Sequence, residues 1–471
     1  MGQQRRDGGW DESPLLLYRI IPTLAAILAL QQHDPDGKHE QAVTAGLAYL
    51  NALPTHCLKP LPNIIPVAFE LIAPRLLADA QRAGLPVRGE LFAGVVAAGE
   101  KRRKRMAMMP APESNSPLYA SWEAWGQRPA AHEVTDAGGV GHSAAATSYW
   151  LKASAGCDEL AEARQVARRY LANASAATGL GIPGVMPSAW PVNRFEQSFM
   201  LHILLLGDLL HHPRLQPIVT RQLDDLHAAL TPAGIGFSDH FMPDGDDTAA
   251  ALAVLNLAGR RVSPKALTAF QHDAHFSTYP FELHNSITVT ARATQALAIS
   301  GVSVRQWRKA IVDAQYDNGW WVGDKWNVSR LYSTCIALSA LHNAGYDSAK
   351  EAARKAILNS QHPNGGWGEG QDATQVETAF ALLALRILER DGFVDPITHH
   401  ALVRGNRWLA YAVEHGQICT KPVWICKDLF SPARIDRTFV LAALLAPQRA
   451  ARPAPASGDR ANRISRRSAA R

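Results

Sequence analysis

The sequence predicts an all-α fold in which helical hairpins form a barrel. Alanine and leucine are abundant, and the alternation of polar and apolar residues that marks strands is scarce. Two kinds of helix alternate in the C-terminal half. Residues 347–358 have one polar and one apolar face, with Asp347 as a candidate cap, whereas residues 378–385 are apolar on nearly every side. Amphipathic outer helices around buried inner helices describe an α-barrel.

A short repeat, QxxxGxW, supports this architecture. It occurs at residues 4–10, 315–321 and 361–367, and the last two copies begin 46 residues apart, about the length of one helical hairpin. The glycine suits a tight turn, and the tryptophan can pack over it. Three copies of one spacing therefore predict a repeated turn between helices.

The chain divides into three parts in the order of the sequence. Its first apolar run, residues 15–30, contains Arg19 and Pro22 and lacks a cleavage pattern, so it predicts a buried helix and neither a signal peptide nor a membrane span. A loop-like stretch follows residue 225, which predicts domains at 1–225 and 226–446. The tail from residue 447 to 471 is rich in Ala, Pro, Ser and Arg, and we expect it to be disordered.

Charge and cysteine content limit the possible functions. The formal net charge is +6, but the tail holds seven Arg and one Asp, which leaves 41 basic and 41 acidic side chains in residues 1–446. A neutral body argues against nucleic-acid binding. The five Cys are an odd number without a CxxC pair, which argues against a structural zinc site and favours a reducing compartment, the cytoplasm.

The most informative segment is the acidic motif, residues 244–247, in which Asp244, Asp246 and Asp247 precede an apolar run. A plain helix cap explains such a cluster, and a calcium loop or a diphosphate-bound magnesium site would need spacings that are absent. The alternative is a Brønsted acid that protonates an alkene. Neighbouring carboxylates favour the protonated form, and a helix N-terminus stabilises the conjugate base. Aromatic side chains would then surround the resulting cation.

The motif and the QxxxGxW turns together resemble the class II terpene cyclases, specifically bacterial diterpene cyclases of the copalyl diphosphate synthase type. Four further segments are similar to segments of that family: VAFELIAP at residues 67–74, SWEAWG at 121–126, DKWNVS at 324–329 with Tyr332, and WICKDLFSP at 424–432. The resemblance implies two α-barrel domains, called γ (residues 1–225) and β (residues 226–446), with the active site between them.

The resemblance also implies a reaction. Geranylgeranyl diphosphate is protonated at its terminal double bond, two rings close, and loss of a proton gives a bicyclic diphosphate, here expected to be ent-copalyl diphosphate. Asp246 corresponds to the proton donor, tuned by Asp244 and Asp247. A class I diterpene synthase is expected to use the product. A squalene-hopene-type triterpene cyclase and a non-catalytic α-barrel binding protein remain alternatives.

The resemblance also implies substrate-binding residues and a terminating base, although it does not assign them individually. The basic cluster at residues 101–105 is expected to contact the diphosphate, chiefly through Arg102, Lys104 and Arg105, and Lys325 with Trp326 is a second candidate. The terminating base is expected near His284 and Asn285. Magnesium is implied with unknown ligands, because the place of the plant family's acidic segment reads KPLPN at residues 59–63.

Family members usually carry some tens of residues before the first QxxxGxW turn. In this chain the turn begins at Gln4. The resemblance therefore implies that the γ-type domain is shortened and that a helix closing its barrel is missing.

Overall fold

The fold is almost entirely helical. A computed structural model describes residues 4–11, 13, 15–54, 58, 61, 64–282, 285–416 and 421–447. The helices are α1 (Leu16–His33), α2 (Glu40–Asn51), α3 (Phe69–Arg82), α4 (Ala93–Met106), α5 (Trp122–Trp125), α6 (Ala144–Ala153), α7 (Ala161–Ala177), α8 (Asn193–Leu206), α9 (Gln216–Ala229), α10 (Gly245–Leu257), α11 (Ile287–Ile299), α12 (Arg305–Asp313), α13 (Arg330–Leu341), α14 (Asp347–Asn359), α15 (Gln375–Arg390), α16 (Pro396–Glu414) and α17 (Ala433–Leu445). Short 3₁₀ helices lie at Gly89–Phe92, Pro117–Ser121, Ala131–Glu133, Asp158–Leu160 and Pro264–Phe270.

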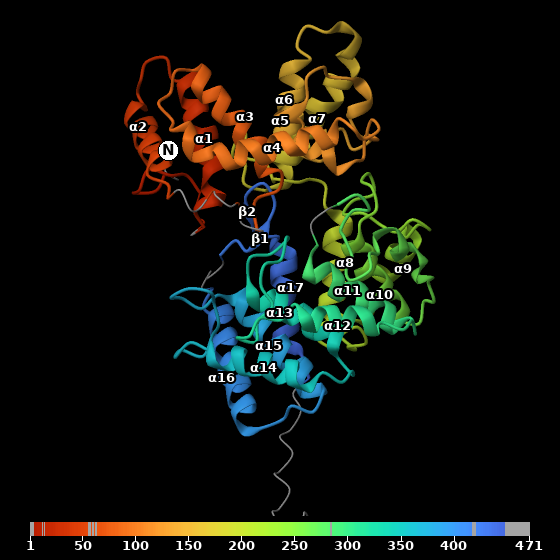
Figure 1. Cartoon of the computed structure of the whole chain (residues 1–471). Coiled ribbons are helices and arrows are strands. Elements are labelled where there is room, and N and C mark those ends of the chain that lie inside the picture. Colours follow the sequence, from red (N-terminus) through yellow and green to blue (C-terminus); the bar gives the residue numbers. More distant parts are fainter. Residues whose placement is uncertain are drawn as a thin grey trace, which may run out of the picture.

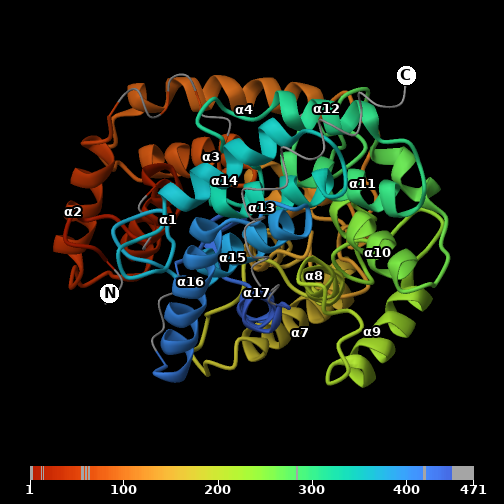
Figure 2. The ribbon, with the colours of Figure 1, turned by 90° about the horizontal axis from the view of Figure 1, so that it is seen from below.

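The C-terminal half is an α-barrel. Helices α8, α10, α11, α13, α15 and α17 each pack against the next, and α17 packs against α8, which closes an inner ring. Helices α9, α12, α14 and α16 lie outside this ring and pack against its members. Every residue of α13 from Leu331 to Leu341 is buried, whereas α14 keeps one exposed face. Figure 1 shows the barrel below the N-terminal helices, and Figure 2 shows α9 at its periphery. The predicted outer and inner layers are confirmed.

The contacts of α8 and α9 place the division between the halves earlier than residue 225. Helix α8 packs against α10 and α17, and α9 packs against α8 and α10, so both helices belong to the barrel. The division therefore lies before Asn193. The loop-like stretch after residue 225 is a turn inside the barrel, where Thr231 and Gly234 form an isolated β-bridge between α9 and α10.

The N-terminal half consists of α1 to α7. Helix α3 packs against α1, α4 and α5, and α6 packs against α5 and α7. An apolar core that includes Ile20, Leu24, Phe69 and Phe92 joins the first of these helices. Figure 1 shows α1 to α3 on one side of this half and α6 and α7 on the other, with α4 and α5 between them. The apolar run at residues 15–30 forms α1 as predicted, but only one face of this helix is buried. Within the described residues no helix is long and apolar enough to cross a lipid bilayer.

The three QxxxGxW turns share one geometry. In the copy at residues 361–367, Gln361 Nε2 donates to the carbonyl oxygens of Gly365 at 2.8 Å and of Ala401 at 2.9 Å. The copies at residues 4–10 and 315–321 make the equivalent pair of bonds. Gly365 has φ +100°, and a Cβ there would lie 2.9 Å from the carbonyl oxygen of Arg404. The glutamine thus ties its turn to a neighbouring helix, and the glycine allows the close approach.

A β-hairpin of β1 (Trp424–Ile425) and β2 (Leu429–Phe430) connects the two halves. Its tip enters the N-terminal half, where Val67 N donates to Cys426 O at 2.8 Å. Lys427 Nζ forms an ion pair with Glu123 and donates to Ser143 Oγ at 2.7 Å. Figure 1 shows the hairpin at the junction. The predicted tail lies outside the described residues beyond Pro447.

Candidate active site

The acidic motif forms the N-terminus of α10. Asp244 is the N-cap, and its Oδ1 accepts the backbone N–H of Asp247 at 2.8 Å. Gly245 N donates to Thr278 O at 2.8 Å, and a Cβ at Gly245 would lie 2.4 Å from the carbonyl oxygen of Ser277. The helix start is thereby held against the 277–278 segment. All three carboxylates of the motif are buried.

Asp246 is paired with a buried arginine from α11. Arg292 Nη1 donates to Asp246 Oδ1 at 2.6 Å, and its Nη2 donates to the hydroxyl oxygen of Tyr332 on α13. The guanidinium lies 4.3 Å from the ring centre of Phe199. Burial raises the pKa of Asp246 to about 6; Arg292 opposes the rise, and Asp324 adds to it. The group therefore exchanges a proton near neutral pH.

Asp244 and Asp247 form a second part of the site. Burial and the neighbouring charge of Asp247 raise the pKa of Asp244 well above its usual range. Burial also raises the pKa of Asp247 to about 7, while hydrogen bonds from Ser198 and Asp244 lower it. Ser198 Oγ donates to Asp247 Oδ1 at 2.5 Å. Because two buried carboxyl groups in contact cannot both ionise easily, this pair retains a proton at neutral pH.

The motif faces a cavity of about 2390 Å³ between the two halves. This volume exceeds the roughly 300–1,000 Å³ of ordinary ligand pockets. Aromatic side chains form much of the wall near the acid; they include Phe195, Phe199, Phe237, Trp326, Tyr332 and Trp424. Such faces attract positive charge in a site from which water is excluded.

Cationic side chains line the cavity on the side of the N-terminal half. Lys101, Arg102 and Arg105 of α4 reach it, and Arg102 is paired with Glu70 of α3. Lys325 lines the cavity from the C-terminal half, where its Nζ pairs with Glu282 and lies 4.5 Å from the Trp326 ring. The cavity therefore has an acidic and aromatic region in the barrel and a basic region on α4.

The chain has relatives of nearly its own length. It is 41% identical over 459 residues to (+)-kolavenyl diphosphate synthase of Herpetosiphon aurantiacus, which covers 95% of this chain and 88% of that protein. This likeness covers both halves and the cavity between them.

The chain belongs to the class II diterpene cyclases.

Further comparisons agree with this family. The cyclase is 35% identical to an uncharacterized protein of Sinorhizobium fredii, over 97% of this chain and 89% of that protein. Its structure is similar to that of ent-copalyl diphosphate synthase from Streptomyces platensis, with a TM-score of 0.74, 27% identity and coverage of 94% of this chain and 89% of the other. Residues 283–385 match the squalene-hopene cyclase C-terminal domain. The expected two-barrel, all-α fold and the expected enzyme class are confirmed, and the alternative of a non-catalytic binding protein is excluded.

The cyclase brings most of the expected site residues to one cavity. Asp244, Asp246 and Asp247 line it, and the expected Arg102, Arg105, Lys325, Trp326 and Asn285 do so as well. Lys104 is exposed and does not line the cavity, whereas its neighbour Lys101 does, because the turn of α4 directs residues 101, 102 and 105 to one side. His284 lies outside the described residues.

Sequence reasoning missed Arg292, the ion-pair partner of Asp246. Its signal was present, because Arg292 is the one charged residue in α11, whose sequence is otherwise ITVTA-ATQALAI. A charge inside a buried helix requires a partner of opposite charge. Ser198 had no comparable signal, since serine is common in helices and its contact with Asp247 spans 49 residues of sequence.

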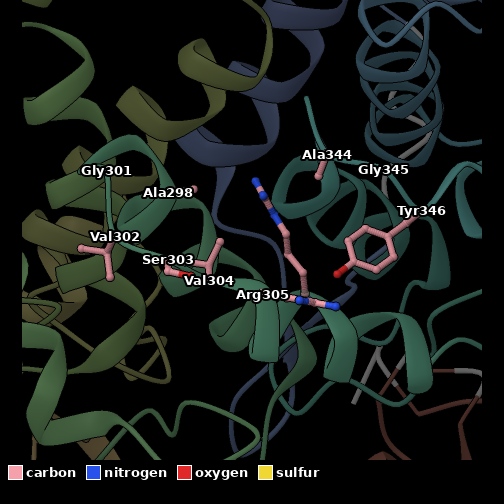
Figure 3. Close-up of a pocket in the computed structure, with 10 residues that line it drawn as sticks. Ala298, Gly301, Val302, Ser303, Val304, Arg305, Ala344, Gly345 and Tyr346 are labelled. Atoms are coloured by element: carbon pink, nitrogen blue, oxygen red, sulfur yellow. The ribbon is translucent and has the colours of Figure 1, made fainter.

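A second hollow, of about 660 Å³, lies on the outside of the barrel between the α11–α12 and α13–α14 connections. Figure 3 shows Arg305 and Tyr346 at its rim among small residues such as Gly301 and Gly345. It contains no carboxylate among its lining residues and is separate from the acidic motif. The cavity between the two halves, which the acidic motif lines, is therefore the candidate active site.

Proposed function

We propose that this cyclase protonates the terminal double bond of geranylgeranyl diphosphate, closes two rings and releases a bicyclic diphosphate. The observation that carries the proposal is the buried Asp246, paired with Arg292 at 2.6 Å and facing a large aromatic cavity. The names of the relatives support it, since one is a kolavenyl and another an ent-copalyl diphosphate synthase. A triterpene substrate is disfavoured because these relatives of full length are named for diphosphate products.

Asp246 is the proposed proton donor. Arg292 occupies Oδ1, which leaves Oδ2 to carry the proton that is transferred to the alkene. The alkene π electrons form the new C–H bond, and the positive charge moves to the adjacent carbon. Arg292 then stabilises the carboxylate that remains, and this strengthens the acid. Asp244 and Asp247 hold a further proton beside it and limit the negative charge of the motif.

The basic residues of the cavity are proposed to bind the diphosphate. Arg102 and Arg105 can each donate two hydrogen bonds to phosphate oxygens. Burial lowers the pKa of Lys325 to about 7, so this side chain adds a positive charge on the opposite wall when it is protonated, which the bound diphosphate favours. The prenyl chain would then extend toward Asp246 along the aromatic faces. Trp326, whose ring contacts Lys325, would lie beside this chain.

Ring closure ends when the final cation loses a proton. Asn285 lines the cavity and, with His284, remains the proposed region of the terminating base. An asparagine is a poor base, so it would act by holding a water molecule that accepts the proton. The electrons of the broken C–H bond form the product alkene.

Magnesium stays a proposed cofactor with no assigned protein ligands. Within the described ranges, no group of three or more His, Cys, Asp and Glu side chains is arranged to hold a metal. Glu70, a carboxylate near α4, is already paired with Arg102. No step of the proposed reaction passes through the ion.

The proposed product keeps its diphosphate, so the next reaction must be one that ionises it. A class I diterpene synthase performs that kind of reaction and is the proposed partner in the pathway. Cys157, Cys335 and Cys426 are free thiols, which supports the proposal of a cytoplasmic location.

A direct assay tests the proposal. Purified protein is incubated with geranylgeranyl diphosphate, the products are dephosphorylated, and the alcohols are compared by mass spectrometry with ent-copalol and kolavenol. We expect a bicyclic alcohol. Recovery of unreacted geranylgeraniol alone, with squalene converted instead, would overturn the proposal.

A further inference from the structure

Helix α17 carries a buried carboxylate that the proposed reaction does not use. Asp436 is 6% exposed, and its Oδ1 accepts the indole N–H of Trp424 at 2.9 Å. The hydroxyl of Ser431 is its other partner. Among the described residues, no Lys, Arg or His side chain forms an ion pair with it. Burial raises the pKa of Asp436 to about 7, and the hydrogen bonds from Trp424 and Ser431 oppose the rise. Above this pH, Asp436 carries a buried negative charge with no cation of the described residues paired to it.

The partner of this carboxylate is a wall of the active-site cavity. Trp424 lines the cavity and is 2% exposed. Its ring meets Tyr332 edge to face at 5.0 Å and Phe195 at 5.9 Å, and it lies 6.1 Å from Phe199. The indole therefore packs against three aromatic rings that also line the cavity, with Asp436 at its N–H edge.

Trp424 also adjoins the residues that hold the acid. Its ring packs against Tyr332, whose hydroxyl oxygen accepts a hydrogen bond from Arg292, and Arg292 pairs with Asp246. The hydrogen bonds and ring contacts thus run without a break from the acidic motif to α17. A change in the angle of the indole would alter the cavity wall next to the point where positive charge first forms.

The carboxylate affects the indole in two ways. It fixes the rotation of the ring, because any other orientation would leave the buried N–H without an acceptor. It also draws the positive end of the indole toward itself, which leaves more electron density on the ring faces. Those faces attract a cation in a dry site.

We propose that Asp436 is a positioning residue that acts through Trp424, holding and polarising the indole so that it directs the carbocation to one product. This inference rests on the proposed function for its substrate. It assigns to α17, which carries no residue of the acidic motif, a part in product selection.

The test combines two substitutions. Asp436→Asn keeps the shape of the side chain and an acceptor oxygen but cannot carry the charge that Asp436 has above its pKa of about 7, so both variants are assayed at pH 8. Trp424→Phe removes the N–H. With geranylgeranyl diphosphate, we expect Asp436→Asn to lower kcat about tenfold, to leave KM within about twofold, and to change the ratio of diterpene products. In the Trp424→Phe background the same substitution should have almost no further effect, since the group it acts through is gone.

The control variant is Glu389→Gln, which removes another buried carboxylate, one that pairs with Arg386 and does not line the cavity. It should keep the wild-type product ratio. The inference would be overturned if Asp436→Asn kept the wild-type kcat and product ratio. It would also be overturned if this substitution had the same effect with and without Trp424.

An NMR measurement separates this inference from the proposed function. In protein labelled with ¹⁵N-indole tryptophan, the Trp424 signal is the one that disappears in Trp424→Phe. We expect its proton to resonate downfield in the wild type, as a hydrogen bond to a carboxylate requires, and to move upfield in Asp436→Asn. A wild-type position among solvent-exposed indoles would contradict the inference, whatever substrate the enzyme converts.

Discussion

Asp246 is the residue on which the proposed chemistry depends. We expect Asp246→Asn to lower kcat about 10³-fold or more, because an amide cannot give up a proton to an alkene. Substrate binding should persist, since the proposed diphosphate contacts lie elsewhere in the cavity. Single-turnover assays with equilibrium binding measure the two effects separately. Substantial turnover by the variant would assign the acid role to another carboxyl group.

The pH dependence of the reaction follows from the protonation state of Asp246. The acid must be protonated to act, and burial raises its pKa to about 6. We therefore expect kcat/KM to be constant at low pH and to fall about tenfold per pH unit above this value. Arg292→Gln should move the falling limb to higher pH, because removing the cation raises the pKa of Asp246, and should lower the maximal rate. If Arg292→Gln left the pH at which kcat/KM falls unchanged, ionisation of Asp246 could not be the cause of that fall.

At the scale of elements, the glycines of the QxxxGxW turns are placed by close contact as well as by backbone angle. Gly365 and Gly392 both have positive φ, +100° and +94°, but only at Gly365 would a Cβ approach another chain segment, at 2.9 Å from Arg404 O. We expect Gly365→Ala to lower the free energy of unfolding by about 2–3 kcal/mol, and the matched Gly392→Ala by about 1 kcal/mol. Urea denaturation monitored by circular dichroism provides both values. Equal losses would mean that backbone strain alone matters.

The hairpin of β1 and β2 is the other element with a specific role, since it joins the halves. Lys427→Met would remove the cation paired with Glu123, whose side chain is only 13% exposed, and we expect a loss of about 2–3 kcal/mol of stability. Adding Glu123→Gln should recover part of the loss, because the uncompensated charge is gone. Thermal denaturation of the single and double variants tests this, and a double variant no more stable than Lys427→Met would contradict the role assigned to the pair.

Much of the fold could be predicted from the sequence because its turns and inner helices have distinctive local sequence patterns. The turns repeat at QxxxGxW, and the inner helices are apolar on all sides, as in α13. The domain division could not be placed correctly, because α8 reveals its membership of the barrel only through packing against α10 and α17, far away in sequence. Likewise, the acidic motif could be predicted because its residues are contiguous in the sequence. Arg292, the partner of Asp246, lies 46 residues away on another helix, so the pair could not be predicted.

Across the whole molecule, the proposed function depends on enclosing an acid between the two halves. The barrel supplies Asp246 and the aromatic wall, α4 of the N-terminal half supplies basic residues, and the hairpin holds the two halves together. The cavity between them is large enough for a prenyl diphosphate chain. The proposed reaction begins with protonation inside this cavity.

Reaction in deuterium oxide shows whether the substrate is protonated in the cavity. The exchangeable proton of Asp246 becomes deuterium, so protonation of geranylgeranyl diphosphate should place one deuterium in the bicyclic product, which keeps its diphosphate. Mass spectrometry before and after dephosphorylation measures both features. A product with no added deuterium, or one that has lost its diphosphate during the reaction, would contradict initiation by protonation.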